Sequence, residues 1–184
     1  MNITEFFQLR AGTWKSLRTS HQPAIKRSES ANSEIQVEFL ESIDPQVAQL
    51  STLHGFGAEQ TLCGIAVKWK GADKSQTQAQ NQAQNQAGSA ILVAIAGEDP
   101  QQGKILRQQV GSDQVPVIGR YSIGNDDVLS LITESDRLHA EEKMWFPRPN
   151  ICMRAGFTVD LTAGSEAETV SSFCTEIRIV KPSI

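Results

Sequence analysis

One short stretch of the chain combines an aromatic ring, a cation and two hydroxyls at a spacing of two. In residues 12–22, GTWKSLRTSHQ, a strand places Trp14, Ser16, Arg18 and Ser20 on one face. A guanidinium offers forked donors that match a carboxylate, so this face is a candidate wall for an acid-bearing ligand. The alternative is that Arg18 faces solvent while its neighbours cover the edge of a core. This stretch alone leaves both interpretations open.

Three later stretches carry similar polar rows. The rows are Glu142, Met144 and Phe146; Cys152, Arg154, Gly156 and Thr158; and Cys174, Glu176 and Arg178. In a closed barrel, one face of every strand lines the interior. Either these polar rows or the apolar rows opposite them point inward, and periodicity does not decide which.

The elements that must position these side chains are mainly strands. About ten strand-like runs follow one another, separated by turn signals such as those at 97–100 and 124–127, which predicts a sandwich or a closed barrel. Only two helices are expected. One covers roughly residues 3–10, and the other starts at Asp44-Pro45 and ends before Gly55. Together they could close one end of a barrel.

Composition limits the class of protein. A chain of 184 residues fits one domain, and its net charge of -4 argues against binding nucleic acid through phosphate contacts. No apolar run reaches the roughly 20 residues of a membrane span. The first residues lack the pattern of a signal or transit peptide, so we expect a cytosolic protein without membrane insertion.

Cysteine usage and known motifs add little chemistry. Cys63, Cys152 and Cys174 are odd in number and widely spaced, which predicts buried free thiols; no Cys/His spacing suggests a metal site. The common nucleophile, nucleotide and metalloprotease motifs are missing. The glutamine-rich residues 74–88 are low in complexity and predict a flexible loop without a catalytic role.

A set of short segments, in order, resembles a known family. The segments are Arg18–His21 after Gly12 and Trp14, Gly119–Tyr121, Leu129–Glu134, Glu141–Phe146, Pro149–Asn150 and Ser172–Arg178. Together they resemble the S/U-type phycobiliprotein chromophore lyases, the CpcS/CpeS group, from about residue 5 to residue 180. The resemblance implies a single domain over 1–184. Its fold would be an all-β, ten-stranded antiparallel up-and-down barrel, lipocalin-like or fatty-acid-binding-protein-like, with an N-terminal helix and one inserted helix.

The resemblance also implies an activity. Members bind an open-chain bilin as substrate, here expected to be phycocyanobilin, with no permanently bound cofactor. They deliver it to a cysteine of an apo-phycobiliprotein subunit, expected to be the β-subunit, in the cyanobacterial cytosol. Partners would be a second copy or a sister S-type lyase. The cysteine thiol adds to an ethylidene group of the bilin, so the lyase contributes by holding and orienting the bilin.

Site residues follow from the same resemblance. Glu142 is the expected catalytic acid, which would protonate the bilin. The expected bilin contacts are Arg18, Trp69 and Arg154, followed by Trp14, Ser20 and Trp145, for which packing in a core is at least as plausible.

The chain departs from the family pattern at several polar positions. Ser135 stands where a tyrosine is common, Lys143 where arginine is usual, and Cys152 where an arginine is expected; small residues, Ala155-Gly156, replace a hydroxyl pair. Loss of an arginine at 152 would remove a propionate anchor. Three interpretations stay open: an active lyase with a remodelled pocket, a companion subunit of a two-subunit lyase, or a barrel that carries a fatty acid or similar ligand without transferring it.

Overall fold

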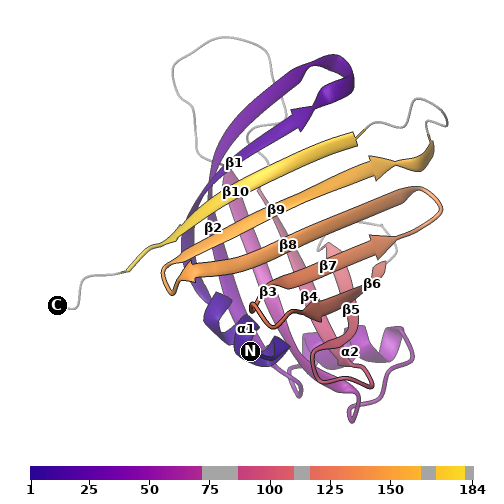
Figure 1. Ribbon diagram of the computed structural model, residues 1–184. Helices are drawn as coiled ribbons and strands as arrows, with labels where there is room; N and C mark the ends of the chain where they lie inside the picture. Colours follow the sequence, from indigo (N-terminus) through magenta and orange to yellow (C-terminus); the bar gives the residue numbers. More distant parts are fainter. Residues whose placement is uncertain (72–86, 110–116, 163–168, 181–184) are drawn as a thin grey trace.

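The chain forms a closed ten-stranded barrel with two helices at one end (Figure 1). The computed structural model describes residues 1–71, 87–109, 117–162 and 169–180. The elements are α1 (Ile3–Arg10), β1 (Gly12–Gln22), η1 (Pro23–Ile25), β2 (Arg27–Glu41), α2 (Pro45–Leu53), β3 (Thr61–Gly71), β4 (Gly88–Ala96), β5 (Gln102–Gln109), β6 (Val117–Ile123), β7 (Leu129–Glu134), β8 (Leu138–Arg148), β9 (Ile151–Asp160) and β10 (Thr169–Arg178).

Each strand pairs antiparallel with the next along the chain, and β10 returns to pair with β1. Residues 97–100 and 124–127 lie between β4 and β5 and between β6 and β7, as their turn signals predict. The predicted up-and-down barrel is therefore confirmed. The predicted loop at 74–88 lies outside the described residues except for its end, since Gly88 begins β4.

Both predicted helices are present, with the expected N-terminal signals. The Asn2 side chain accepts a hydrogen bond from the backbone of Glu5, whose carboxylate accepts one in return from the Asn2 N–H, which completes a capping box for α1. Asp44 caps α2 ahead of Pro45. Among the described residues, no helix is long and apolar enough to cross a membrane.

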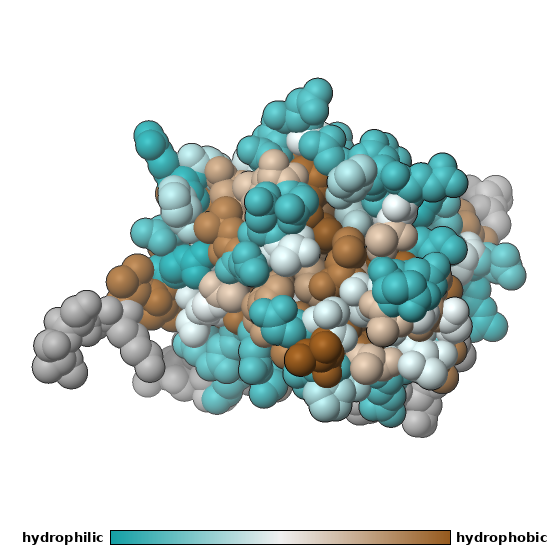
Figure 2. Space-filling view, turned by 90° about the horizontal axis from the view of Figure 1, so that it is seen from below, coloured by the Kyte–Doolittle hydropathy of each residue, from teal (hydrophilic) through white to brown (hydrophobic). Residues whose placement is uncertain are grey.

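The two helices lie on different sides of the barrel wall. Helix α1 buries Ile3, Phe6 and Phe7 in the cluster that fills the base of the interior. Helix α2 packs Val47 and Leu50 against outward side chains of β4 and β5. Gly64 permits this approach, because a Cβ there would lie 2.7 Å from Val47 Cγ2. Seen from below, the helical end is covered by side chains, with hydrophilic groups around smaller hydrophobic ones (Figure 2).

Candidate functional site

The polar rows of the predicted strands face the barrel interior. Trp14 is 0% exposed, and it packs with Ile35, its register partner on β2, in the interior cluster. Strand alternation then directs Ser16, Arg18 and Ser20 inward as well. Of these, Ser16 is buried, whereas Arg18 is exposed and Ser20 half-buried. The interior is thus closed at the helical end and accessible toward the other end.

Four charged side chains form a continuous chain in the interior. Arg10 of α1 donates through Nη2 to Oε2 of Glu176. Arg154 on β9 donates through Nη1 to Oε1 of the same carboxylate at 3.3 Å. Arg154 also donates to Glu142 on β8, through Nε at 2.9 Å and through Nη2. Glu176 therefore joins the buried base to the Glu142–Arg154 pair.

Exposure changes along this chain of charges. Glu176 is 0% exposed and the Arg10 side chain only 4%. The side chains of Arg154 and Glu142 keep 28% and 30% of their surface accessible. Solvent therefore reaches the Glu142–Arg154 pair, while the Arg10–Glu176 pair is part of the core.

The neighbouring charges shift the pKa values of Glu142 and Arg154. Burial by itself would raise the pKa of the Glu142 carboxyl, but Arg154, together with Arg107 and Arg18, outweighs it and holds that pKa below its ordinary value. Burial would lower the pKa of Arg154, yet Glu142 and Glu176 raise it above the ordinary value. Glu142 is consequently a carboxylate at neutral pH, whereas a general acid works best with a pKa near the working pH.

A pH prediction follows from the lowered pKa of Glu142. Above its ordinary value of 4.5 this carboxyl is ionised in both the folded and unfolded chains, and its pairing with Arg154 stabilises the fold. Below that pH the unfolded chain takes up the proton first, so this contribution declines and is lost as pH falls through the folded pKa. We expect the difference in unfolding free energy between wild type and Glu142→Gln to be constant from pH 6 to 8 and to shrink below about pH 4.5. Urea unfolding across this range measures it, and a difference that grows on acidification contradicts the assignment.

Trp14 is placed in the closed base rather than on the accessible wall. Its indole Nε1 donates to the Arg10 carbonyl oxygen at 3.0 Å. The guanidinium groups of Arg10 and Arg178 lie 4.7 and 4.2 Å from the centre of its ring. Arg178 in turn donates to the carbonyls of Leu9 and Ala11 at the end of α1. These contacts give Trp14 a role in packing.

The other two tryptophans predicted as bilin contacts, Trp69 and Trp145, lie on opposite faces of the barrel wall. Trp69 faces the interior from β3, is half-buried and packs against the interior cluster. Its strand partner is Gly88, where any Cβ would collide with the indole ring. Trp145 instead lies on the outer face of β8, with its ring centre 6.4 Å from that of Phe173. The structure therefore does not bring Trp145 together with the interior residues, because it alternates with Phe146, which points inward toward Phe6 and Trp14.

Sequence reasoning did not single out Arg107 on β5. Leu106 is 0% exposed in the outer cluster beneath α2, and Ile105 belongs to the interior cluster. Alternation therefore points Arg107 inward, where its charge acts on Glu142. The pattern Ile105-Leu106-Arg107 is ambiguous in sequence because both faces of β5 bury an apolar side chain at this level.

The three cysteines are free and buried, as predicted. Burial raises the pKa of the Cys152 thiol to about 12, and burial also raises the pKa values of Cys63 and Cys174. A thiol attacks as its thiolate, so none of the three is set up as a nucleophile. In the part of the chain that the structure describes, no group of three or more His, Cys, Asp or Glu side chains could hold a metal ion.

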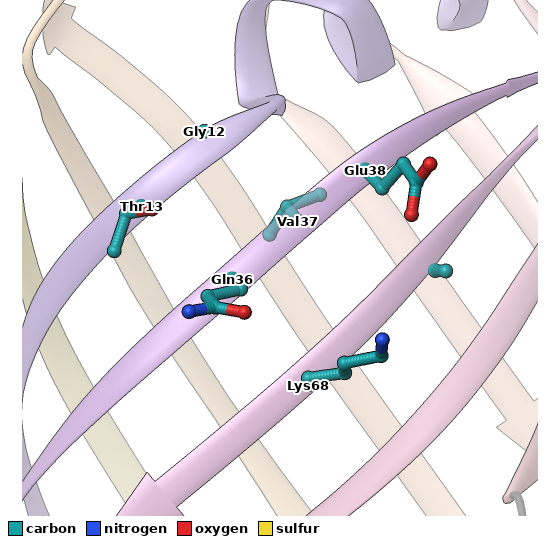
Figure 3. A pocket seen from close by; sticks show the side chains of 7 residues that line it. Gly12, Thr13, Gln36, Val37, Glu38 and Lys68 are labelled. Carbon is teal, nitrogen blue, oxygen red and sulfur yellow. The ribbon is translucent and has the colours of Figure 1, made fainter.

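Two hollows lie on the outer surface of the barrel. One, of about 330 Å³, is lined by outward side chains of β1–β3 such as Thr13, Gln36 and Lys68 (Figure 3). The other, of about 520 Å³, lies over β8–β10 between Phe157 and Phe173. Neither is lined by a residue predicted for the site.

Comparisons with known proteins agree with this architecture. Residues 2–179 match the sequence model of a family described as "CpeS-like protein". A "Chromophore lyase CpcS/CpeS" of Thermosynechococcus vestitus is 36% identical over 180 residues, which covers 97% of this chain and 93% of that protein. A "Phycocyanobilin lyase subunit CpcS" of a Picosynechococcus species is 36% identical over 176 residues, 95% of this chain and 85% of that protein.

A solved structure has the same fold. The S-type phycobiliprotein lyase CPES from Guillardia theta superposes with a TM-score of 0.80 at 27% identity, over 98% of this chain and 94% of that one. Two full-length relatives above 30% identity and a family match over nearly the whole chain agree. The chain belongs to the CpeS-like family.

Proposed function

We propose that this protein is a phycobiliprotein chromophore lyase of the cyanobacterial cytosol. It binds an open-chain bilin, phycocyanobilin, inside the barrel and promotes attachment of the bilin to a cysteine of an apo-phycobiliprotein subunit. The single observation that carries the proposal is the accessible Glu142–Arg154 pair inside the barrel. The relatives named chromophore lyases support the choice of ligand.

The interior suits the chemistry of a bilin. A bilin has a flat conjugated body, a row of pyrrole nitrogens and two propionates. Trp69 offers a flat apolar surface, and Glu142 offers a carboxylate that can accept hydrogen bonds from several pyrrole N–H groups. Because Glu142 is ionised, we assign it the role of counter-ion to a protonated bilin rather than that of proton donor.

For Arg154 we propose a positioning role in place of the expected contact with the bilin. All three of its hydrogen-bonding nitrogens already donate to Glu142 or Glu176. It therefore orients Glu142 and keeps it ionised, and we do not assign it a propionate. Ser20, half-buried above Arg18 on the same inward row, is a further candidate polar contact.

The reaction needs orientation more than a nucleophile from the lyase. The sulfur of the acceptor cysteine bonds to the exocyclic carbon of the bilin, and the thiol proton passes to the bilin ring. This addition has no leaving group and involves no net oxidation or reduction. The lyase's own thiols are buried and take no part. The lyase would hold the bilin in one conformation, with its reactive group toward the open end of the barrel. This positioning speeds the addition because the thiol meets a bilin that is already oriented for reaction.

A covalent attachment assay tests this function. The purified protein is mixed with phycocyanobilin and an apo-phycobiliprotein β-subunit, with and without a sister S-type lyase, and covalent bilin fluorescence is measured after denaturing electrophoresis. Attachment by this protein alone supports an active lyase and excludes a purely companion role. Attachment only with the sister lyase supports the companion role. No attachment and no change in bilin absorbance under any condition overturns the proposal.

An apolar outer face supports a partner barrel. The outward row of β9, which includes Met153, Ala155 and Phe157, is apolar. Beside it, Leu17 on β1 and Phe173 and Ile177 on β10 are 51%, 45% and 57% exposed. Neither α1 nor α2 covers this face, in contrast to the β4–β5 face beneath α2. Exposed apolar patches of this kind mark interaction sites. One relative is named a lyase subunit, and we propose that a second copy of this chain docks here.

The partner face predicts a change of oligomeric state. Because glutamate at position 173 would place a charge in the centre of the buried face, Phe173→Glu should convert a dimer into a monomer in sedimentation velocity at micromolar concentration. Ile43→Glu is the matched control, since Ile43 is 87% exposed in the β2–α2 connection, and it should leave the dimer intact. A monomeric wild-type chain, or a Phe173 variant that is still dimeric, would rule out this face.

A further inference from the structure

Two arginines face the accessible interior without an ion pair. Arg18 on β1 and Arg107 on β5 are both exposed, and among the described residues neither has a hydrogen bond or salt bridge. In the closed strand order, β1 and β5 are four strands apart one way and six the other, so the two arginines come from nearly opposite walls. An unpaired guanidinium inside a barrel is a ready anion-binding group.

Their inward direction follows from strand pairing. Arg18 lies in register with Cys174, which is in turn paired with Arg154. Arg107 lies in register with Leu92 on β4, a residue packed against the interior cluster. The charges of Arg18 and Arg107 both act on Glu142. The two guanidinium groups therefore share one interior space with that carboxylate.

The surroundings of Glu142 carry an excess of positive charge. Four arginines (Arg10, Arg18, Arg107 and Arg154) act on two glutamates (Glu142 and Glu176). Both glutamates are already engaged by Arg10 and Arg154. The excess therefore resides on Arg18 and Arg107, and a ligand with two carboxylates would balance it.

We propose that Arg107 is the second propionate anchor of the site, with Arg18 as the first, so that each binds one propionate of the bilin while Glu142 faces the pyrrole nitrogens. This inference rests on the proposed function, since a bilin supplies the two carboxylates. It also accounts for the departure at position 152. Cys152 is 0% exposed in the closed base, so an arginine is not needed there to meet a ligand in the accessible part of the barrel.

Esters of the two propionates test whether the arginines bind the ligand through its carboxylates or affect binding in another way. Phycocyanobilin and its dimethyl ester are titrated into wild type, Arg107→Gln, Arg18→Gln and the double variant, and binding is followed by bilin absorbance. Wild type should bind the free acid more tightly than the ester. Each single variant should weaken binding of the free acid about tenfold, which is the affinity that one hydrogen bond to a charged group contributes. Binding of the ester should be unchanged, because the ester has no carboxylate for the arginine to bind. The double variant should bind both forms equally.

Arg120→Gln is the matched control. Arg120 is on the neighbouring strand β6, faces outward and pairs with Glu134 at 2.8 Å with both side chains more than half exposed. Arg107→Lys should bind the free acid more tightly than Arg107→Gln but less tightly than wild type, because lysine restores the positive charge without the paired N–H donors of a guanidinium. Unchanged affinities in Arg107→Gln, or equal losses for acid and ester, overturn this inference alone. If wild type binds neither form, the proposed function itself fails.

Discussion

Replacing Glu176 by glutamine should lower the free energy of unfolding by about 3–5 kcal/mol, the cost of breaking a buried ion pair by removing one partner. Glu176 is 0% exposed and holds Arg10 and Arg154 at once. Arg10 Nη1 is buried without a hydrogen-bond partner in the described structure. The bond from Arg10 Nη2 to Glu176 is thus the main interaction that offsets the cost of burying the Arg10 charge.

Urea or thermal unfolding measures this loss. Glu134→Gln is the control, because its pair with Arg120 is exposed and should contribute no more than about 1 kcal/mol. The double variant Arg10→Met, Glu176→Gln should recover much of the stability, since it removes the orphaned charge as well. A loss below about 1 kcal/mol for Glu176→Gln would show that the base does not depend on this carboxylate.

Replacing Glu142 by glutamine should slow covalent attachment about a hundredfold, the usual effect of removing one preorganised electrostatic group. Glutamine keeps the size of the side chain but removes the charge that would stabilise a protonated bilin. The bound bilin should accordingly lose the long-wavelength absorbance of its protonated form. Rates of attachment to the apo-subunit and absorbance spectra of the bound bilin measure the two effects.

Glu141→Gln is a closely matched control for this experiment. Glu141 precedes Glu142 on β8, points to the outer face and lies 3.2 Å from His139. The Glu141 variant should attach bilin at the wild-type rate. If Glu142→Gln keeps the wild-type rate and spectrum, the counter-ion role of Glu142 is wrong.

Much of the fold could be predicted from the alternation of side chains and from helix-end signals. Asp44-Pro45 marks the start of α2, and the turns at 97–100 and 124–127 lie where Gly, Asp and Asn cluster. Both signals are local, because capping and turn chemistry depend on only a few neighbouring residues. Closure of the barrel by β1–β10 pairing is a long-range contact. The strand pattern left a sandwich and a closed barrel open, and the family resemblance favoured the barrel.

The site was harder to predict, because strand alternation gives two faces without naming the inner one. Trp145 and Phe146 illustrate this, since both are aromatic neighbours and only Phe146 enters the interior. Arg10 ends the helix predicted over residues 3–10, but its pairing with Glu176 joins residues 166 positions apart in the sequence. Arg107 was hidden because the outer face of β5 is covered by α2 and looks like a core in sequence.

A crystal structure of the protein with phycocyanobilin would show where the bilin binds and which side chains contact it. We expect the bilin inside the barrel, with the Glu142 carboxylate within hydrogen-bonding distance of the pyrrole nitrogens and the propionates on Arg18 and Arg107. A bilin seated on the outer surface, or one inside the barrel with its propionates on Arg154 and no contact to Glu142, would contradict this expectation.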